Sequence, residues 1–143
     1  PRSTLFPYTT LFRSLGKKGS GKTKRLIDMC NKATAESKGN VIFIEKDSTL
    51  TYDISHAARL VVADEYGIKG FEAFYGFIAG MCAGNYDITD IFVDSTLKIG
   101  GRDMEAFADF IEMLSKLQTN MVLSISADKS EIAERIAEYA TEL

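Results

Sequence analysis

Cysteine is scarce in this chain of 143 residues, which contains only Cys30 and Cys82. Both lie in apolar patterns with helical spacing, so we expect two reduced core residues and neither a disulfide framework nor a metal site. Long hydrophobic runs are absent as well. No stretch of about 18 apolar residues occurs, and no membrane-spanning helix is expected. These absences favour a cytoplasmic protein that does not associate with a membrane.

An excess of positive charge is also missing, since 17 lysines and arginines stand against 20 aspartates and glutamates and the net charge is −3. A protein that binds nucleic acid without regard to sequence needs a basic face, so we expect no nucleic-acid partner of that kind. The hydrophobic share of 45% is that of an ordinary globular protein, and the length suits one domain with a real core.

The first part of the chain differs from the rest. Residues 4–14 match the translation of a widely used sequencing-library adapter. We therefore predict that residues 1–14 are a non-native segment and that residues 15–143 are the single domain. The segment stands where a buried strand should precede the motif described below. We expect Leu11 to Leu15 to take the place of that strand, with Arg13 fitting badly and residues 1–9 unpacked.

Beyond this segment, helical and strand-like patterns alternate. The apolar spacing predicts helices over residues 22–37, 70–83 and 103–118, and a last helix that begins at Asp128, where Glu131 completes a capping-box pair. Short apolar runs predict buried strands at residues 41–44, 60–63, 91–93 and 121–126. Such alternation predicts an α/β fold, a three-layer α/β/α sandwich around a mostly parallel sheet.

One segment carries recognisable chemistry: Gly16-Lys17-Lys18-Gly19-Ser20-Gly21-Lys22-Thr23 matches the pattern G-x-x-x-x-G-K-[ST]. The glycines allow backbone conformations in which successive N–H groups point at phosphate oxygens. Lys22 places an ammonium on the β- and γ-phosphates, and the Thr23 hydroxyl is a ligand for Mg²⁺. The helix that follows adds its positive N-terminal dipole. We therefore expect these eight residues and Lys24 to bind ATP with Mg²⁺. No guanine-reading Asn-Lys-x-Asp pattern occurs, which favours ATP over GTP.

Such a site normally has an acidic residue at the end of a nearby strand, which holds Mg²⁺ through water. Asp94 and Asp64 both end strand-like runs, and we favour Asp94 as the metal-facing and catalytic carboxylate. We expect its strand to be adjacent to the strand that leads into Gly16. Asp94 is followed by Ser95, which cannot activate water as a carboxylate does, so a base has to come from elsewhere. Glu65 is the candidate for that role. Ser124 and Ser126 on the last strand either sense the γ-phosphate or fill space in the sheet.

With these residues in hand, the chain from about Leu15 to Tyr139 resembles the P-loop NTPase superfamily, and within it a group of short ATP-binding proteins of clostridial bacteria. The resemblance rests on Gly16–Thr23, Ile91–Asp94 and Asp64–Ile68. It implies the P-loop NTPase fold, a nucleoside triphosphate and Mg²⁺. The motif's roles carry over to Gly16, Gly21, Lys22 and Thr23, and to Asp94. The resemblance implies no substrate and no cellular process.

Three functions remain open at this point. The leading hypothesis is an ATP-binding protein that hydrolyses ATP slowly with Mg²⁺ and acts as a switch through a protein partner or as a homo-oligomer. A small-molecule kinase is the first alternative, although the few scattered arginines supply no clear phosphate clamp. A binding module that holds nucleotide without hydrolysis is the second. The sequence leaves open whether the protein is an enzyme.

Overall fold

The computed structural model describes residues 10–14, 21–48 and 53–141, with residues 10–14 and 141 described by their backbone alone. Six strands occur in these residues: β1 (Thr10–Ser14), β2 (Asn40–Glu45), β3 (Arg59–Val62), β4 (Ile88–Val93), β5 (Asn120–Ile125) and β6 (Ala140–Thr141). The α-helices are α2 (Lys22–Glu36), α3 (Phe71–Gly84), α4 (Thr96–Gly100) and α5 (Met104–Leu114). Three 3-10 helices complete the described elements: η1 (Ala63–Tyr66), η2 (Lys129–Glu131) and η3 (Glu134–Tyr139).

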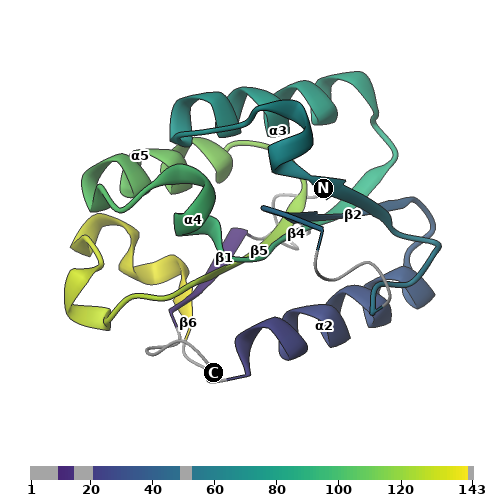
Figure 1. Ribbon diagram of the computed structural model, residues 1–143, viewed down its shortest axis with the longest axis horizontal. Coiled ribbons are helices and arrows are strands. Elements are labelled where there is room, and N and C mark those ends of the chain that lie inside the picture. The colour runs from purple at the N-terminus through teal and green to yellow at the C-terminus, as the bar shows by residue number, and fades with distance from the viewer. Residues whose placement is uncertain (1–9, 15–20, 49–52, 142–143) are drawn as a thin grey trace, which may run out of the picture.

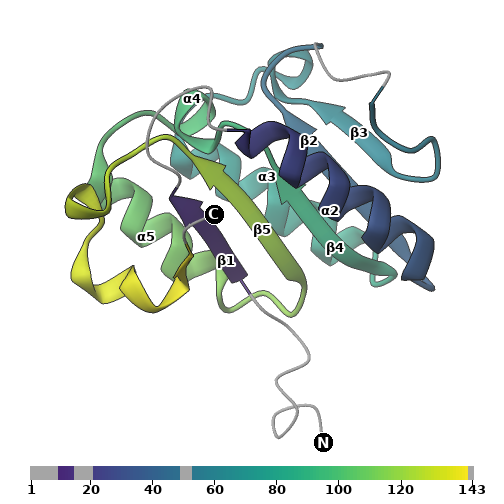
Figure 2. The ribbon, with the colours of Figure 1, turned by 90° about the horizontal axis from the view of Figure 1, so that it is seen from below.

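The strands form one sheet in the order β3-β2-β4-β5-β1-β6, and every pair of neighbours is parallel. Figure 2 shows β5 lying between β1 and β4. All carboxyl ends of parallel strands lie at one edge of a sheet, so the residues that follow the strands gather there. The fold therefore brings the chain segments after β2, β4 and β5 to a common edge.

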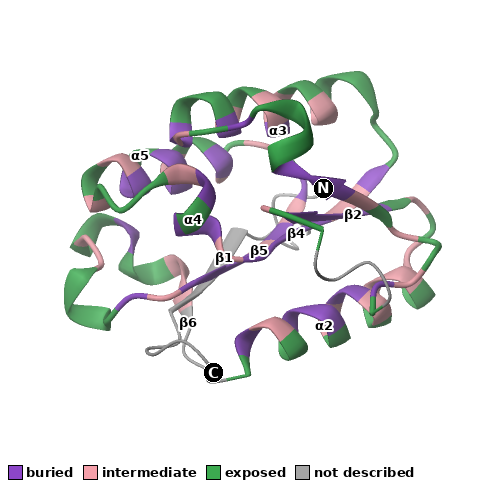
Figure 3. Ribbon diagram, viewed as in Figure 1, coloured by how far each residue is buried: buried purple, intermediate pink, exposed green. Residues whose placement is uncertain are grey.

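Helices cover both faces of the sheet, which confirms the predicted α/β/α sandwich. In Figure 1, α2 lies on one face and α3, α4 and α5 lie on the other. Each face has its own core. The α2 face is built around Phe43, Phe92 and Cys30, and the opposite face includes Phe74 and Phe107. The central strands are largely buried from both sides (Figure 3), which explains the short continuous apolar runs within them, at residues 41–44, 91–93 and 121–123.

Local chemistry fixes the bounds of α5. The Asp103 carboxylate caps the helix by accepting the backbone N–H groups of Glu105 and Ala106 at 3.1 and 3.2 Å. Phe107, Ile111 and Leu114 follow on one face of the helix, and each is 0% exposed. This is the amphipathic helix that the sequence predicts, with its end four residues earlier because the chain turns at Ser115.

The prediction of one long helix from Asp128 is wrong. The capping box between Asp128 and Glu131 is present, but it opens the short 3-10 helix η2, and a second 3-10 helix, η3, follows after a break. The chain then pairs as β6 with β1 at the edge of the sheet. Pairing at this edge pulls the chain into an extended path and shortens the helical segment that precedes it.

The segment expected to replace the first strand does so by backbone pairing. Residues Thr10–Ser14 form β1, which pairs with β5 over five residues and with β6 over two. Leu15, the Arg13 side chain and residues 1–9 lie outside the described residues, so the predictions made for them stay untested. In the part of the chain that is described, no helix has the length and apolar character needed to cross a membrane.

Candidate functional site

The described part of the G-x-x-x-x-G-K-[ST] segment begins at Gly21; Gly16, Lys17, Lys18, Gly19 and Ser20 lie outside the described residues. Gly21 is the residue before α2 and has a φ of 86°, in the left-handed region. A side chain is strained in this conformation, which accounts for glycine at this position. The turn directs Lys22 and Thr23 into the first turn of α2, while Lys24 is exposed.

Lys22 is a buried cation with only 9% of its surface exposed. Its ammonium donates a hydrogen bond to the Ser126 hydroxyl, which follows β5. Burial lowers the pKa of Lys22 from its ordinary value; the nearby Asp94 carboxylate opposes this change and the Lys98 ammonium adds to it. The ammonium also stands at a helix N-terminus, where the dipole disfavours a positive charge. An anion at this point would offset the cost of burying the ammonium, the repulsion by Lys98 and the unfavourable helix dipole.

Asp94 is the buried carboxylate of the site, with 8% of its surface exposed. Two hydroxyls donate to its Oδ1 atom, that of Thr23 at 3.1 Å and that of Ser124 at 3.0 Å. The Ser95 hydroxyl lies 3.3 Å from Oδ2. The Ser124 hydroxyl in turn accepts the backbone N–H of Ser95 at 2.9 Å. The carboxylate is therefore held in a defined position beside the first turn of α2.

The strand order corrects one expectation about Asp94. Its strand, β4, is not adjacent to β1, because β5 lies between them. Asp94 nevertheless reaches Thr23, since two strand spacings of about 4.8 Å each are close to the diameter of one helix. The first turn of α2, which follows β1 in the chain, can thus contact the residue that follows β4. Asp94 meets the Thr23 hydroxyl as predicted, but the strand that separates β4 from β1 also contributes Ser124.

A cleft of about 590 Å³ opens beside these residues. Its lining residues are Gly21, Lys22, Thr23, Ser95, Lys98, Arg102 and Ser126. Three of them are cations from separate turns of the chain: Lys22, Lys98 and Arg102. Arg102 donates to the Ser126 carbonyl at 2.7 Å. With the Asp94 carboxylate alongside, the cleft carries an excess of positive charge, which suits an anion with several negative oxygens.

Lys98 and Arg102 were not predicted as site residues. They lie in and just after α4, a five-residue helix that the apolar spacing did not indicate. The sequence signal that could have identified them is their closeness to Asp94 along the chain, because residues that closely follow a strand end stay near the carboxyl edge of the sheet. Ser126, predicted as a residue that senses phosphate or fills space, lines the cleft and contacts Lys22.

The alternative acidic pair lies elsewhere. Asp64 follows the outer strand β3, and its carboxylate forms an ion pair with Lys46 at 3.0 Å. Glu65 is exposed on η1 and is not among the residues that line the cleft. Strand β2 separates β3 from β4, so the fold does not bring Asp64 or Glu65 to Asp94.

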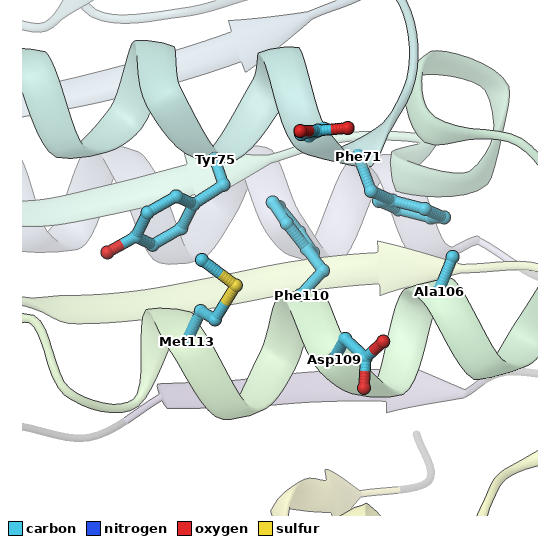
Figure 4. Close-up of a pocket in the computed structure, with 7 residues that line it drawn as sticks. Phe71, Tyr75, Ala106, Asp109, Phe110 and Met113 are labelled. Atoms are coloured by element: carbon cyan, nitrogen blue, oxygen red, sulfur yellow. The ribbon is translucent and has the colours of Figure 1, made fainter.

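A second hollow, of about 360 Å³, lies between α3 and α5 (Figure 4). It is lined mainly by Phe71, Tyr75, Phe110 and Met113, and its charged lining residues are the carboxylates Glu72 and Asp109. Acidic groups repel phosphate, so this hollow does not suit the ligand that the motif predicts. The cleft beside Lys22 is therefore the candidate functional site.

Comparisons with known proteins bear on the fold. No protein-family model matches the chain, and no curated protein matches it. Domain III of the replication initiation protein DnaA from Thermotoga maritima superposes with a TM-score of 0.51 and 14% sequence identity, over 95% of this chain and 55% of that one. A structure of Drosophila ORC bound to AT-rich DNA and Cdc6 gives a TM-score of 0.45 and 14% identity, over 96% of this chain and 48% of that one. The chain spans about half the length of these two structures.

At this level of identity the likeness to DnaA domain III concerns the fold. The chain has a P-loop NTPase-like fold, a mixed α/β domain with a parallel sheet flanked by helices. The resemblance to clostridial ATP-binding proteins stays a prediction. The DNA in the ORC structure is a property of that assembly. The comparisons lend no support to the expectation that nucleic acid is not a partner of this chain.

Proposed function

We propose that this protein binds ATP with Mg²⁺ in the cleft beside Lys22 and acts as a slow ATPase switch. The observation that carries the proposal is that a buried ammonium, that of Lys22, and a buried carboxylate, that of Asp94, lie next to Thr23: Lys22 precedes it in the chain and Asp94 accepts its hydrogen bond. Lys22 is 9% exposed and lines the cleft, and Asp94 is 8% exposed and accepts a hydrogen bond from Thr23, which also lines the cleft. A phosphate chain and a hydrated cation need these two charges side by side.

The oxygen atoms near Thr23 fit Mg²⁺. The Thr23 hydroxyl and Asp94 Oδ1 lie 3.1 Å apart, and both are hard donors of the kind that Mg²⁺ prefers. Magnesium takes few protein ligands and keeps several waters, so one hydroxyl and one carboxylate are a sufficient set. Once bound, the ion would neutralise phosphate charge and polarise the phosphoryl oxygens. Ser124 and Ser95 would hold the Asp94 carboxylate toward it.

The remaining residues of the cleft would orient the phosphates. Lys22 would transfer its hydrogen bond from Ser126 to phosphate oxygens, and Lys98 and Arg102 would add positive charge from α4 and the turn after it. Release of Ser126 by Lys22 would change the contacts of the segment after β5, which gives bound nucleotide a route to influence the chain surface. This is the basis for proposing a switch that acts on a protein partner or on a second copy of the chain.

A nucleotide-binding and turnover assay on the purified chain tests the proposal. The chain is titrated with fluorescent ATP and GTP analogues in the presence of Mg²⁺ and again in the presence of EDTA. The release of phosphate from unlabelled ATP is followed over hours. We expect Mg²⁺-dependent binding that favours ATP, with slow hydrolysis. Transfer of phosphate to an added small-molecule acceptor would indicate a kinase, and binding without any turnover would indicate a nucleotide-holding module. No binding of either nucleotide would refute the proposal.

A further inference from the structure

Glu45 is an acidic residue at the end of an otherwise largely apolar strand. It ends β2, and only 2% of its surface is exposed. The other buried residues of that strand are Val41, Ile42, Phe43 and Ile44. Glutamate is rarely buried to this extent, because removing a carboxylate from water is expensive. A polar site nearby is the usual reason for keeping such a group.

The register of the sheet places Glu45 next to Asp94. Ile44 is the partner of Val93 in the β2–β4 ladder, and the Asp94 backbone N–H continues that ladder by donating to the Ile44 carbonyl at 2.9 Å. Glu45 therefore lies opposite Asp94. Residues in register on parallel strands are separated by about 4.8 Å and point to the same face.

Ser124 completes the row on the other side. Val93 pairs with Leu123 in the β4–β5 ladder, so Ser124 lies opposite Asp94, and its hydroxyl donates to the Asp94 carboxylate at 3.0 Å. Phe43 and Phe92, each two residues before the row, pack in the core on the α2 face. By strand alternation, Glu45, Asp94 and Ser124 face the same side of the sheet. That side is the one from which Thr23 approaches Asp94.

We propose that Glu45 is the general base for ATP hydrolysis, an inference that rests on the ATP-binding function proposed above. Ser95 follows Asp94, and a serine hydroxyl does not accept a proton at neutral pH. Glu65 is exposed beyond β3, with the whole of β2 between its strand and β4. Glu45 is the carboxylate that the sheet register places beside Asp94, on the face where Thr23 and Lys22 begin α2.

In the proposed step, the oxygen of a water molecule forms a bond to the γ-phosphorus. The bond from that phosphorus to the oxygen that bridges it to the β-phosphate breaks, and the electron pair stays with ADP. Glu45 accepts the proton that the water loses and then releases it to solvent. The products are ADP and inorganic phosphate, and no group is oxidised or reduced. Asp94 stays with the cation, so the two neighbouring carboxylates have separate tasks.

The test compares Glu45→Gln with the parent chain, using affinity for a fluorescent ATP analogue, thermal stability and ATP hydrolysis. We expect the ATP dissociation constant to change by less than about threefold and hydrolysis to fall by at least about 100-fold, the range for loss of a general base. After incubation with ATP, the nucleotide recovered from the variant should be ATP, and the nucleotide recovered from the parent should be ADP. Glu36→Gln, an exposed change at the end of α2, is the control and should leave all three readouts unchanged.

A purely structural role for Glu45 is distinguished by chemical rescue. Hydrolysis by Glu45→Ala should recover when formate is added, since a small carboxylate can replace the missing base but cannot replace a packing contact. If Glu45→Gln does not fold, Glu45→Asp keeps the charge on a shorter stem, and it should bind ATP normally with hydrolysis reduced at least tenfold.

Hydrolysis by Glu45→Gln within threefold of the parent would overturn the inference and leave the binding proposal intact. So would loss of hydrolysis in Glu65→Gln with Glu45→Gln unaffected, or a parent chain that binds ATP and never hydrolyses it. A parent chain that does not bind ATP would instead refute the proposed function itself, and the role of Glu45 would fall with it.

Discussion

Replacing Lys22 with methionine should separate the two effects of its buried ammonium. Methionine keeps an unbranched apolar stem and removes the charge, so the packing of α2 against the sheet is largely retained. In the nucleotide-free protein the ammonium is disfavoured by burial and by its place at a helix N-terminus. We therefore expect Lys22→Met to bind ATP weakly and yet to unfold at the same temperature as the parent or at a higher one.

The size of the binding loss follows from the contact that disappears. A charge-assisted hydrogen bond contributes about 2–3 kcal/mol, which corresponds to a dissociation constant raised about 30- to 150-fold. In the nucleotide-free protein, the Lys22→Met substitution removes the hydrogen bond from the ammonium to the Ser126 hydroxyl and the attraction between the ammonium and Asp94. These losses are offset by the desolvation that the charge no longer requires. The net change in the free energy of unfolding should lie within about 1 kcal/mol of zero.

Titration with a fluorescent ATP analogue measures the first effect, and urea denaturation without nucleotide measures the second. Lys32→Met, an exposed change on the same helix, is the matched control and should alter neither. A folded Lys22→Met protein with unchanged ATP affinity would remove Lys22 from the nucleotide site. A loss of several kcal/mol in the unfolding free energy would contradict the view that its ammonium is disfavoured without an anion.

Three further perturbations test other parts of the structure, and a fourth tests the N-terminal segment. Asp94→Asn keeps the hydroxyl contacts and removes the charge, so the gain in ATP affinity on adding Mg²⁺ should shrink by about tenfold in calorimetric titrations; an undiminished gain would rule Asp94 out as the metal-facing group. Gly21→Ala brings its methyl group within 4 Å of no other described part of the chain but requires a φ of 86°, so urea denaturation should show a loss of about 1–2 kcal/mol that comes from backbone strain. Burial raises the pKa of the Cys30 thiol to about 11, so a thiol reagent at pH 8 should label Cys82 first, and equal labelling rates would contradict this. Because Cys30 ionises at a higher pH in the folded chain than in the unfolded chain, the free energy of unfolding should fall as pH rises from about 9 to about 11. Replacing residues 1–14 with Met and an apolar strand should raise the melting temperature if that segment is non-native, and an unchanged temperature would count against that interpretation.

The fold class could be predicted because the central strands are buried on both faces. Residues 41–44, 91–93 and 121–123 are continuous apolar runs, and each of them lies within a strand of the structure. The last segment could not be predicted in the same way. Ile136 is fully buried and Tyr139 is partly buried, so the apolar positions were read correctly. The sequence spacing does not reveal that Ala140 pairs with β1 and draws the chain out of a helix.

The position of β1 illustrates how little side-chain information a strand in this sheet requires. Its backbone pairs with β5 over Thr10–Ser14 and with β6 over two residues. Every residue except proline brings the same backbone donor and acceptor to such a ladder, so an unrelated sequence can occupy the strand. The residues that meet in the candidate site come from β4, β5, α2 and the turns after them. Their arrangement therefore depends less on the sequence of β1 than on its path.

The order of the strands decides which polar residues meet at the edge of the sheet. A motif and a strand-end carboxylate predict that Lys22, Thr23 and Asp94 share an edge, because all carboxyl ends of a parallel sheet point the same way. They do not predict the lateral neighbours, which follow from long-range pairing. With β5 on one side of β4 and β2 on the other, Ser124 and Glu45 flank Asp94, while Asp64 lies one strand further out and pairs with Lys46. Two strand spacings of about 4.8 Å each separate Asp64 from Asp94, more than a hydrogen bond can span, whereas Ser124 is one spacing away and bonds to Asp94. The same carboxylates in another strand order would therefore form a different site.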